Sequence, residues 1–151
     1  MDGLKLKGKS QRVVKSIDEI DHNFKRGIRQ GWFRSGDKLI ERANEQVLKK
    51  PKSGRVYNIR KGNRLVRHRA SAPGQSPANR TGTYRKSLGY KIRGWRDLEF
   101  GSTARGNAPY SVFLEQGTQK MKPRPGLGNA VKVEEGKIQR ILEAEIKKAL
   151  T

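Results

Sequence analysis

The apolar residues in the first third of the chain recur at intervals of three or four. This spacing is that of one stripe along an amphipathic helix, and it predicts a long N-terminal helix over residues 11–50. Ser10 is placed to cap the first turn, and Pro51 ends the pattern. A basic tail of residues 1–10 precedes the helix. The stripe consists of Val13, Ile17, Ile20, Phe24, Ile28, Trp32, Leu39, Ala43 and Val47.

Three glycines interrupt this helical pattern. Each of Gly27, Gly31 and Gly36 lowers helix propensity by about 1 kcal/mol relative to alanine. Three arrangements are compatible with them: the helix bends between Gly31 and Gly36, the glycines let another backbone approach closely, or the chain forms two helices. The pattern does not decide between these arrangements.

A β-hairpin is predicted next. The segments Arg55–Ile59 and Arg64–Ala70 contain β-branched and aromatic side chains, and they flank a turn at residues 60–63. The following segment, Ser71–Gly82, is rich in Ser, Pro, Gly and Asn, which predicts a loop. Residues 51–82 are therefore expected to form a basic hairpin followed by a loop.

Residues 83–130 have the pattern of a small sheet region. Thr83–Leu88 is expected to form one or two helical turns. Strands are predicted at Tyr90–Trp95 and Leu98–Ser102, because their side chains alternate as in a half-buried antiparallel pair. Ala108–Gln116 is aromatic and apolar enough to form a buried helix or strand against this pair.

The end of the chain returns to helical spacing. Residues 131–151 are predicted to form a C-terminal amphipathic helix, regular from about Glu134 onward. The order of long helix, basic hairpin, small antiparallel sheet and C-terminal helix is an α+β pattern. At 151 residues the chain is expected to form a single domain. The stripe of the last helix consists of Val133, Ile138, Ile141, Leu142, Ile146 and Leu150.

The composition allows only a modest core, because the hydrophobic fraction is 32%. A small core gains little free energy over the entropy that the chain loses on folding. We therefore expect neighbours in an oligomer to supply part of the stability.

The positive charge is concentrated in the middle of the chain. The formal net charge is +21 at pH 7, and residues 51–96 contain thirteen Lys and Arg residues but no acidic residue. A solvated face usually mixes both signs, whereas a block of one sign repels itself unless an anionic surface lies opposite. A solubility face is the simpler interpretation, and contact with nucleic-acid phosphates or an acidic protein surface is the favoured one.

The sequence lacks the usual residues for catalysis and metal binding. It has no cysteine, which excludes disulfides, thiolate metal sites and thiol nucleophiles. His22 and His68 have no carboxylate cluster at metal-ligand spacing. No Ser, Thr or Tyr stands in a nucleophile-elbow or lysine-paired context. We expect no enzymatic activity, no metal and no cofactor.

No apolar run approaches the roughly 18 residues that a membrane-spanning helix requires. The first residues, MDGLKLKGKS, lack the apolar core of a signal peptide. We therefore expect a soluble protein that is made in a cytosol and has no membrane contact.

The stretch EQGTQKMKPRPGLGNA, residues 115–130, connects the sheet region to the last helix and is called the joint below. It lacks the Lys-Ser/Thr of a P-loop and the third glycine of a dinucleotide fingerprint, which argues against a cofactor loop. Pro123 and Pro125 fix φ and remove backbone donors. The stretch is therefore predicted to be a stiff connection that sets the angle of the last helix.

Two stretches together carry a family resemblance. The first, HRASAPGQSPANRTGTYRKSL at residues 68–88, contains A-S-A-P-G-x-x-P-A followed by T-G-x-x-x-x-S and an aliphatic residue. The second, YSVFLEQGTQKMKPRPGLGNA at residues 110–130, leads into the terminal helix. In this order and spacing they resemble the small neck proteins of long-tailed phages, the head-to-tail joining or tail-completion proteins of lambdoid phages and prophages.

Members of that family have an aromatic segment ending in Glu-x-Gly-Thr, then a Met, an Arg-Pro-aromatic motif, and an Ala that opens the last helix. Gly126 departs from this pattern, because it stands where the family has a large apolar residue. The matching positions here are Glu115, Gly117, Thr118, Met121, Arg124, Pro125 and Ala130.

The resemblance implies an α+β fold, no catalysis, and a homo-oligomeric ring in the neck between the capsid portal and the tail. The implied partners are portal, adaptor or tail proteins and the genome DNA, and the implied location is the virion, with assembly in the host cytoplasm. The matched joint residues other than Ala130 would form an inter-subunit or docking loop. The cations expected to face DNA phosphates or an acidic partner are Arg55, Arg60, Lys61, Arg64, Arg67, Arg69, Arg80, Arg85 and Lys86.

The alternative is a protein of another class. A stand-alone nucleic-acid-binding protein of the ribosomal or chromatin-associated kind would also have a net charge of +21 and a pI near 10.8.

Overall fold

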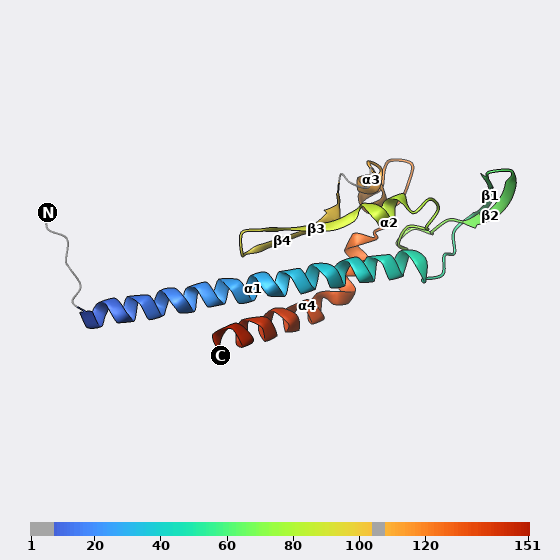
Figure 1. The fold of residues 1–151 in the computed structure, drawn as a ribbon. Helices are drawn as coiled ribbons and strands as arrows, with labels where there is room; N and C mark the ends of the chain where they lie inside the picture. The colour runs from blue at the N-terminus through green and yellow to red at the C-terminus, as the bar shows by residue number, and fades with distance from the viewer. Residues whose placement is uncertain (1–7, 104–107) are drawn as a thin grey trace.

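A computed structural model describes residues 8–103 and 108–151 of the chain, and it has an α+β architecture, as the sequence predicts (Figure 1). The elements in chain order are α1 (Gly8–Leu48), β1 (Val56–Lys61), β2 (Arg64–Arg69), α2 (Thr83–Ser87), β3 (Leu88–Arg93), β4 (Asp97–Ser102), α3 (Ser111–Gln116) and α4 (Leu127–Leu150).

Helix α1 is continuous over 41 residues, about 60 Å of helix, which excludes the break into two helices that the sequence pattern had left open. It begins at Gly8, so residues 8–10 belong to the helix and Ser10 does not cap it. Residues 1–7 of the predicted basic tail lie outside the described residues.

The helical glycines allow close approach, which was one of the three predicted arrangements. A Cβ atom at Gly27 would lie 2.9 Å from Cβ of Ala149, and one at Gly31 would lie 2.7 Å from Cδ2 of Leu142. A Cβ at Gly36 would lie 2.5 Å from the ring of Tyr90. Gly27 and Gly31 therefore allow α4 to pack closely against α1, and Gly36 allows the Tyr90 ring of β3 to do so.

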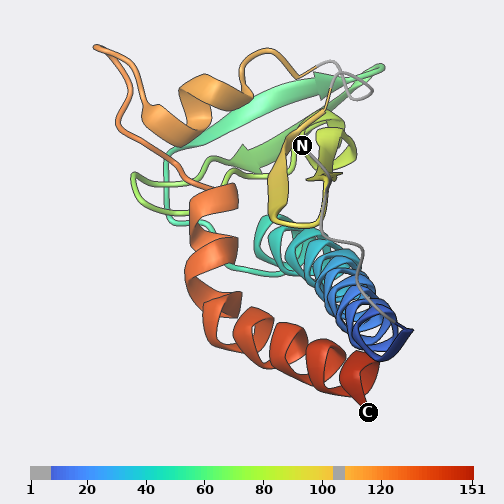
Figure 2. The same cartoon turned by 90° about the vertical axis from the view of Figure 1, so that its left-hand side faces the viewer.

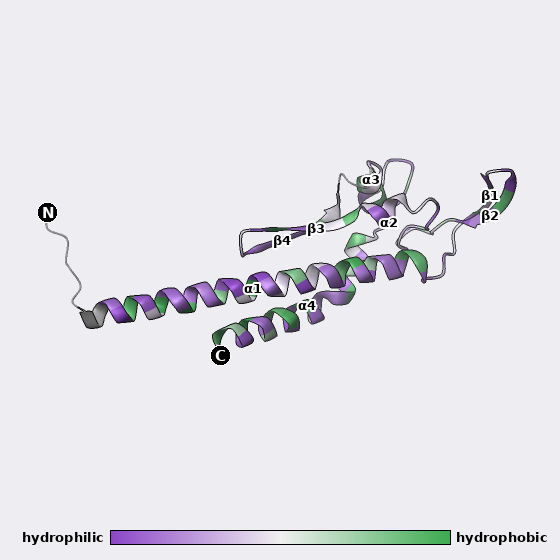
Figure 3. Cartoon of the chain, in the orientation of Figure 1, coloured by the Kyte–Doolittle hydropathy of each residue, from purple (hydrophilic) through white to green (hydrophobic). Residues whose placement is uncertain are grey.

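Helices α1 and α4 pack side by side in antiparallel orientation, with α4 and the β3–β4 pair on different sides of α1 (Figure 2). The C-terminal end of α4 reaches only to the level of Gly27, so the first turns of α1 extend beyond it (Figure 1). The apolar stripe continues along this extension, but there Val13, Ile17 and Ile20 are each 59% exposed. Figure 3 shows hydrophobic residues on this unpaired part of α1.

The described residues contain two separate antiparallel pairs of strands. Strands β1 and β2 pair from Val56 opposite Arg69 to Lys61 opposite Arg64, with Gly62 at φ +60° in the turn. They project from the end of the molecule where α1 ends (Figure 1). Strands β3 and β4 lie over α1, and β3 begins at Leu88, two residues before the predicted strand.

The helices near the C-terminus differ from their predicted form. The segment predicted to be buried against the sheet forms α3, whose Val112 and Phe113 are more than half exposed. Helix α4 begins at Leu127 rather than near Glu134, so the end of the joint is helical.

The core is small and partly polar. Among the described residues, the largest fully buried side chains are Glu134, Ser35 and Ser87. Because few large apolar side chains are fully buried, hydrophobic burial stabilises the single chain only modestly. The buried polar groups contribute little beyond their hydrogen bonds. The buried apolar residues are Leu39, Ala43, Val47, Tyr84, Leu88, Ala108 and Ala130.

Candidate nucleic-acid and protein interface

The β1–β2 hairpin with its flanking Arg55, residues 55–69, is called the basic arm below. Its six predicted contact cations are all exposed, and none of them forms an ion pair with a carboxylate in the described part of the chain. An isolated two-stranded hairpin is at best marginally stable in water. The arm therefore presents unneutralised charge on an element that has little packing of its own. These six residues are Arg55, Arg60, Lys61, Arg64, Arg67 and Arg69.

The strand register divides the side chains of the arm between two faces. One face carries Arg60 opposite Leu65, and Arg67 and Arg69 follow on the same side of the sheet. Leu65 is 70% exposed. On the other face Tyr57 packs edge-on against His68, with ring centroids 5.4 Å apart.

The remaining three predicted contact cations lie outside the arm. Arg80 lines a cavity of about 310 Å³ together with Tyr57 and His68, so the structure brings it to the base of the arm. Arg85 and Lys86 lie on α2, do not line this cavity, and Arg85 is half-buried.

Glu115 is held inside the chain at the start of α4. Its carboxylate accepts hydrogen bonds from the backbone N–H groups of Gly126 and Leu127, both at 2.7 Å, and of Gly128 at 3.3 Å. It also accepts one from the Tyr84 hydroxyl at 3.0 Å. These N–H groups have no partner within the helix, and the positive end of the helix dipole favours a carboxylate there. Glu115 therefore caps α4 from a distant part of the sequence.

Burial and the neighbouring Glu115 charge raise the pKa of Tyr84 above its ordinary value of 10.0. The hydroxyl group therefore stays protonated and remains a donor to Glu115 over the ordinary pH range.

Tyr84 and Pro77 take the space beside Gly126. A Cβ atom at Gly126 would collide with the hydroxyl oxygen of Tyr84 and would lie 3.0 Å from Cδ of Pro77. A large apolar residue has no room at this position in this chain.

The other docking residues predicted from the family form a tight turn. Gly117 has φ +80°, and a Cβ there would lie 2.7 Å from the carbonyl oxygen of Met121. The N–H of Thr118 donates to the same oxygen at 2.7 Å, and the N–H of Arg124 donates to Leu114 at 2.7 Å. Of these residues Thr118 is exposed, whereas Met121, Arg124 and Pro125 are half-buried.

The two motif stretches lie against one another. The N–H of Gly74 donates to the carbonyl of Pro123 at 2.8 Å, and the Ser76 hydroxyl donates to that of Pro125 at 3.3 Å. The side-chain amide of Asn129 donates to the carbonyl of Gly74 at 3.0 Å. Residues far apart in the sequence thus form one hydrogen-bonded layer at the start of α4.

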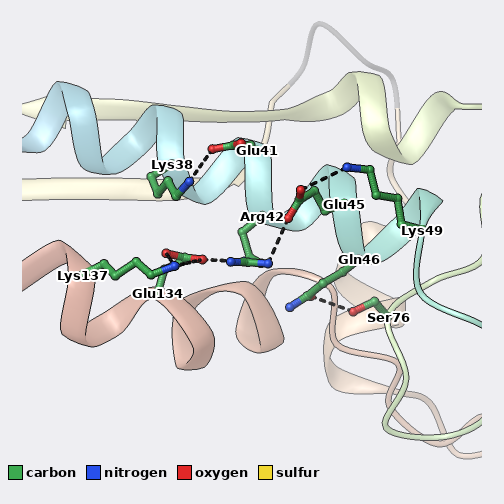
Figure 4. A network of polar contacts seen from close by, with 9 residues as sticks. All are labelled: Lys38, Glu41, Arg42, Glu45, Gln46, Lys49, Ser76, Glu134 and Lys137. Carbon is green, nitrogen blue, oxygen red and sulfur yellow. Dashed lines mark hydrogen bonds and ion pairs between the residues drawn. The ribbon is translucent and has the colours of Figure 1, made fainter.

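A polar network joins α1 to α4 beneath this layer (Figure 4). The fully buried carboxylate of Glu134 accepts a hydrogen bond from Nε of Arg42, and Nζ of Lys137 lies 3.3 Å from it. Nη1 of Arg42 also donates to Glu45 at 2.9 Å. Burial alone would raise the pKa of Glu134, but the hydrogen bonds from Arg42 and Lys137 outweigh it and lower the pKa below 4.5.

Sequence reasoning missed this network. Glu134 and Glu145 are buried on α4, and Glu145 pairs with Arg34 of α1 at 2.6 Å. The sequence did contain a signal for this network, because Glu134 and Glu145 interrupt the apolar stripe of the last helix. An acidic residue is rarely buried without a cationic partner, so these positions could have indicated buried ion pairs.

Across residues 8–103 and 108–151, no group of three or more His, Cys, Asp or Glu side chains is arranged to hold a metal ion. A search of the same residues finds no helix with the length and apolar character of a membrane span.

Comparisons of the chain with protein-family models, with curated proteins and with solved structures found no match.

Proposed function

We propose that this protein is a structural component of a phage virion at the head-tail interface, where it assembles as a ring in the neck. The ring joins the portal side of the capsid to the tail, and its basic surface faces DNA or acidic partner proteins. The chain acts by assembly and docking, without catalysis.

The observation that carries this proposal is the contact between the two motif stretches. The residues that resemble the neck family form one hydrogen-bonded layer, in which Glu115 caps α4 and the 71–82 loop binds the joint. Two Pro-Gly-rich loops that resemble a family could each match by chance. A chance match is less expected when the two loops also bind each other in the fold.

Two further features support assembly. The arm has six exposed cations without a carboxylate partner in the described residues, and the apolar stripe of α1 extends beyond its intramolecular partner. Surfaces of these two kinds usually mark contacts with other molecules.

The test is the mass of the purified, nucleic-acid-free chain, measured by native mass spectrometry and viewed by electron microscopy. We expect closed rings of many copies. A chain that stays monomeric across all concentrations, with or without portal and tail proteins, would contradict the proposal.

The second candidate is a stand-alone nucleic-acid-binding protein, which the unpaired cations of the arm favour. Phosphate contacts give an affinity that falls steeply with salt, because each neutralised phosphate releases counterions. A monomer that binds DNA or RNA in this way, and whose slope of log affinity against log salt falls by about two on combined Arg60→Ala and Arg67→Ala substitution, would favour this candidate over the ring.

A further inference from the structure

The molecule is elongated, and its two ends differ in character. The N-terminal turns of α1 form one end and the basic arm forms the other (Figure 1). From Ile17 to the end of α1 at Leu48 the helix alone spans about 45 Å. The two ends of one chain therefore do not meet each other.

The first end, residues 11–23, is called the α1 tip below. Its apolar residues Val13, Ile17 and Ile20 are each 59% exposed. They continue a stripe that is covered further along α1, where Phe24 and Trp32 contact Trp95 at the β3–β4 turn and Gly27 and Gly31 lie against α4. At about 25 cal/mol per Å² of apolar surface, covering such residues contributes substantially to an association. The tip is thus an unpaired continuation of an interface that the chain already uses internally.

Acidic residues border this apolar strip. Asp18, Glu19 and Asp21 are the densest acidic run of the sequence, and helical geometry places Asp18 and Asp21 on one flank of Ile17. Asp18 has no ion pair within the described residues, and Asp21 pairs only with the exposed Lys25 at 2.5 Å. An exposed pair of this kind contributes little and is readily exchanged for another.

The opposite end offers a complementary surface. On one face of the arm Leu65 lies near the turn, opposite Arg60 and beside Arg67, and Arg69 follows further along the same face, which is called the Leu65 face below. It combines an apolar side chain that is 70% exposed with cations that have no carboxylate partner in the described part of the chain. The tip has the matching combination, apolar residues flanked by carboxylates.

We propose that the α1 tip of one copy docks on the Leu65 face of a second copy, so that copies join head to tail. Ile17 and Ile20 cover Leu65, and Asp18 and Asp21 lie beside the arginines of that face. In this proposal the partner of the basic arm is a second copy of the chain. The proposal rests on the proposed function, in which copies assemble as a ring.

A contact between two different surfaces of the same chain repeats from copy to copy. It closes into a ring where the rotation between copies allows, and otherwise it continues as a filament. The same contact also covers exposed apolar residues of both the arm and the tip, among them Leu65, Ile17 and Ile20.

The exposed leucine favours a protein partner over DNA on this face. Contact with phosphates needs only charge within range, and it gives no reason for an exposed apolar side chain beside Arg60 and Arg67. Protein interfaces combine apolar and polar groups, and this face places an exposed leucine directly beside two arginines.

Because the sequence has no cysteine, engineered cysteines test the contact directly. The full-length double variant Ile17→Cys and Leu65→Cys should give a ladder of covalent multimers on mild oxidation. Each single variant should give at most dimers. The matched control, Gln139→Cys with Leu65→Cys, places the first cysteine on an exposed position of α4 and should give no ladder.

Charge reversal supplies the second measurement. Asp18→Lys with Asp21→Lys should weaken association at least tenfold by analytical ultracentrifugation, and so should Arg60→Glu with Arg67→Glu. All four changes in one chain should restore association, because the signs are exchanged together. The control Glu135→Lys with Glu143→Lys alters exposed acids of α4 and should change association less than twofold.

A ladder together with charge-swap rescue would establish the contact, whether the copies close into rings or form filaments. Rings that persist in every charge-reversed variant, with no ladder, would overturn the contact and leave the ring itself standing. Filaments held by this contact would instead contradict the ring. Loss of DNA binding by the Arg60→Glu and Arg67→Glu variant, with assembly unchanged, would assign the face to DNA and overturn the proposal.

Discussion

The residue type at position 126 is constrained by Tyr84, which is distant in the sequence. The backbone of Gly126, at φ −90° and ψ −46°, is a conformation that any residue adopts. The constraint is the Tyr84 hydroxyl, which fills the position of a Cβ while it donates to Glu115. The glycine, the tyrosine and the capping glutamate therefore form one unit.

Gly126→Ala is expected to lower the free energy of unfolding by about 1–3 kcal/mol, because the added methyl group overfills the space beside Tyr84. In a Tyr84→Phe background the same change should cost less, and urea unfolding of the four variants measures this coupling. Gly136→Ala is the control, since nothing lies within 4 Å of a Cβ there, and it should stabilise α4 slightly. Equal effects in both backgrounds would contradict the coupling.

At the scale of elements, α1 and α4 are joined by charge as well as by glycine-mediated contact. Gly27 and Gly31 bring the helices close near one end, and Arg42 with Glu134 fixes them near the other. The buried carboxylate makes this pairing dependent on pH.

The pKa of Glu134 is lowered in the folded chain, so its contribution to stability is present above about pH 4.5 and is lost as the pH falls through the lowered pKa. Glu134→Gln should therefore cost about 1–3 kcal/mol at pH 7 and progressively less below pH 4.5. Denaturant unfolding between pH 3 and 7 measures the difference. Glu135→Gln, at an exposed neighbouring position, should have little effect, and a Glu134→Gln cost that does not change with pH would contradict the assignment.

Periodicity was sufficient to predict most of these elements. The long helix, the hairpin turn at Gly62 and the terminal helix follow from apolar spacing and turn residues. The early start of α4 was missed because its cap, Glu115, is distant in sequence and no local signal marks it. The continuity of α1 was left open because glycine spacing alone does not reveal that α4 lies alongside.

The candidate site was less predictable than the fold. The cations of the arm were identified from composition and turn position, and they are exposed in the structure. Sequence reasoning assigned Glu115 to docking, whereas its carboxylate is occupied by four donors within the chain. The exposure of Leu65 and Ile17 depends on which elements lie beside them, and no spacing rule contains that information.

At the scale of the whole molecule, the small polar core and the exposed apolar surfaces make stability depend on assembly. A partner that binds only the folded state stabilises it in proportion to the logarithm of its concentration.

Raising the protein concentration a hundredfold should therefore raise Tm by about 5–10 °C, corresponding to roughly 2.7 kcal/mol of added stability. Differential scanning calorimetry measures this at concentrations below and above the onset of association. A Tm that is independent of concentration across that range would show that the isolated chain supplies its own stability.

The unbroken α1 also fixes the rotational setting between the two ends of the molecule. Each residue added to a helix turns everything beyond it by about 100° and advances it by about 1.5 Å. A single insertion between Ile20 and Phe24 would thus swing Ile17 around the helix axis relative to the arm, whereas an insertion of seven residues there would nearly restore its direction and lengthen the reach. The length of α1 therefore sets the direction in which the tip faces relative to the arm. Chains of this architecture are expected to tolerate changes in the length of this helix in whole heptads.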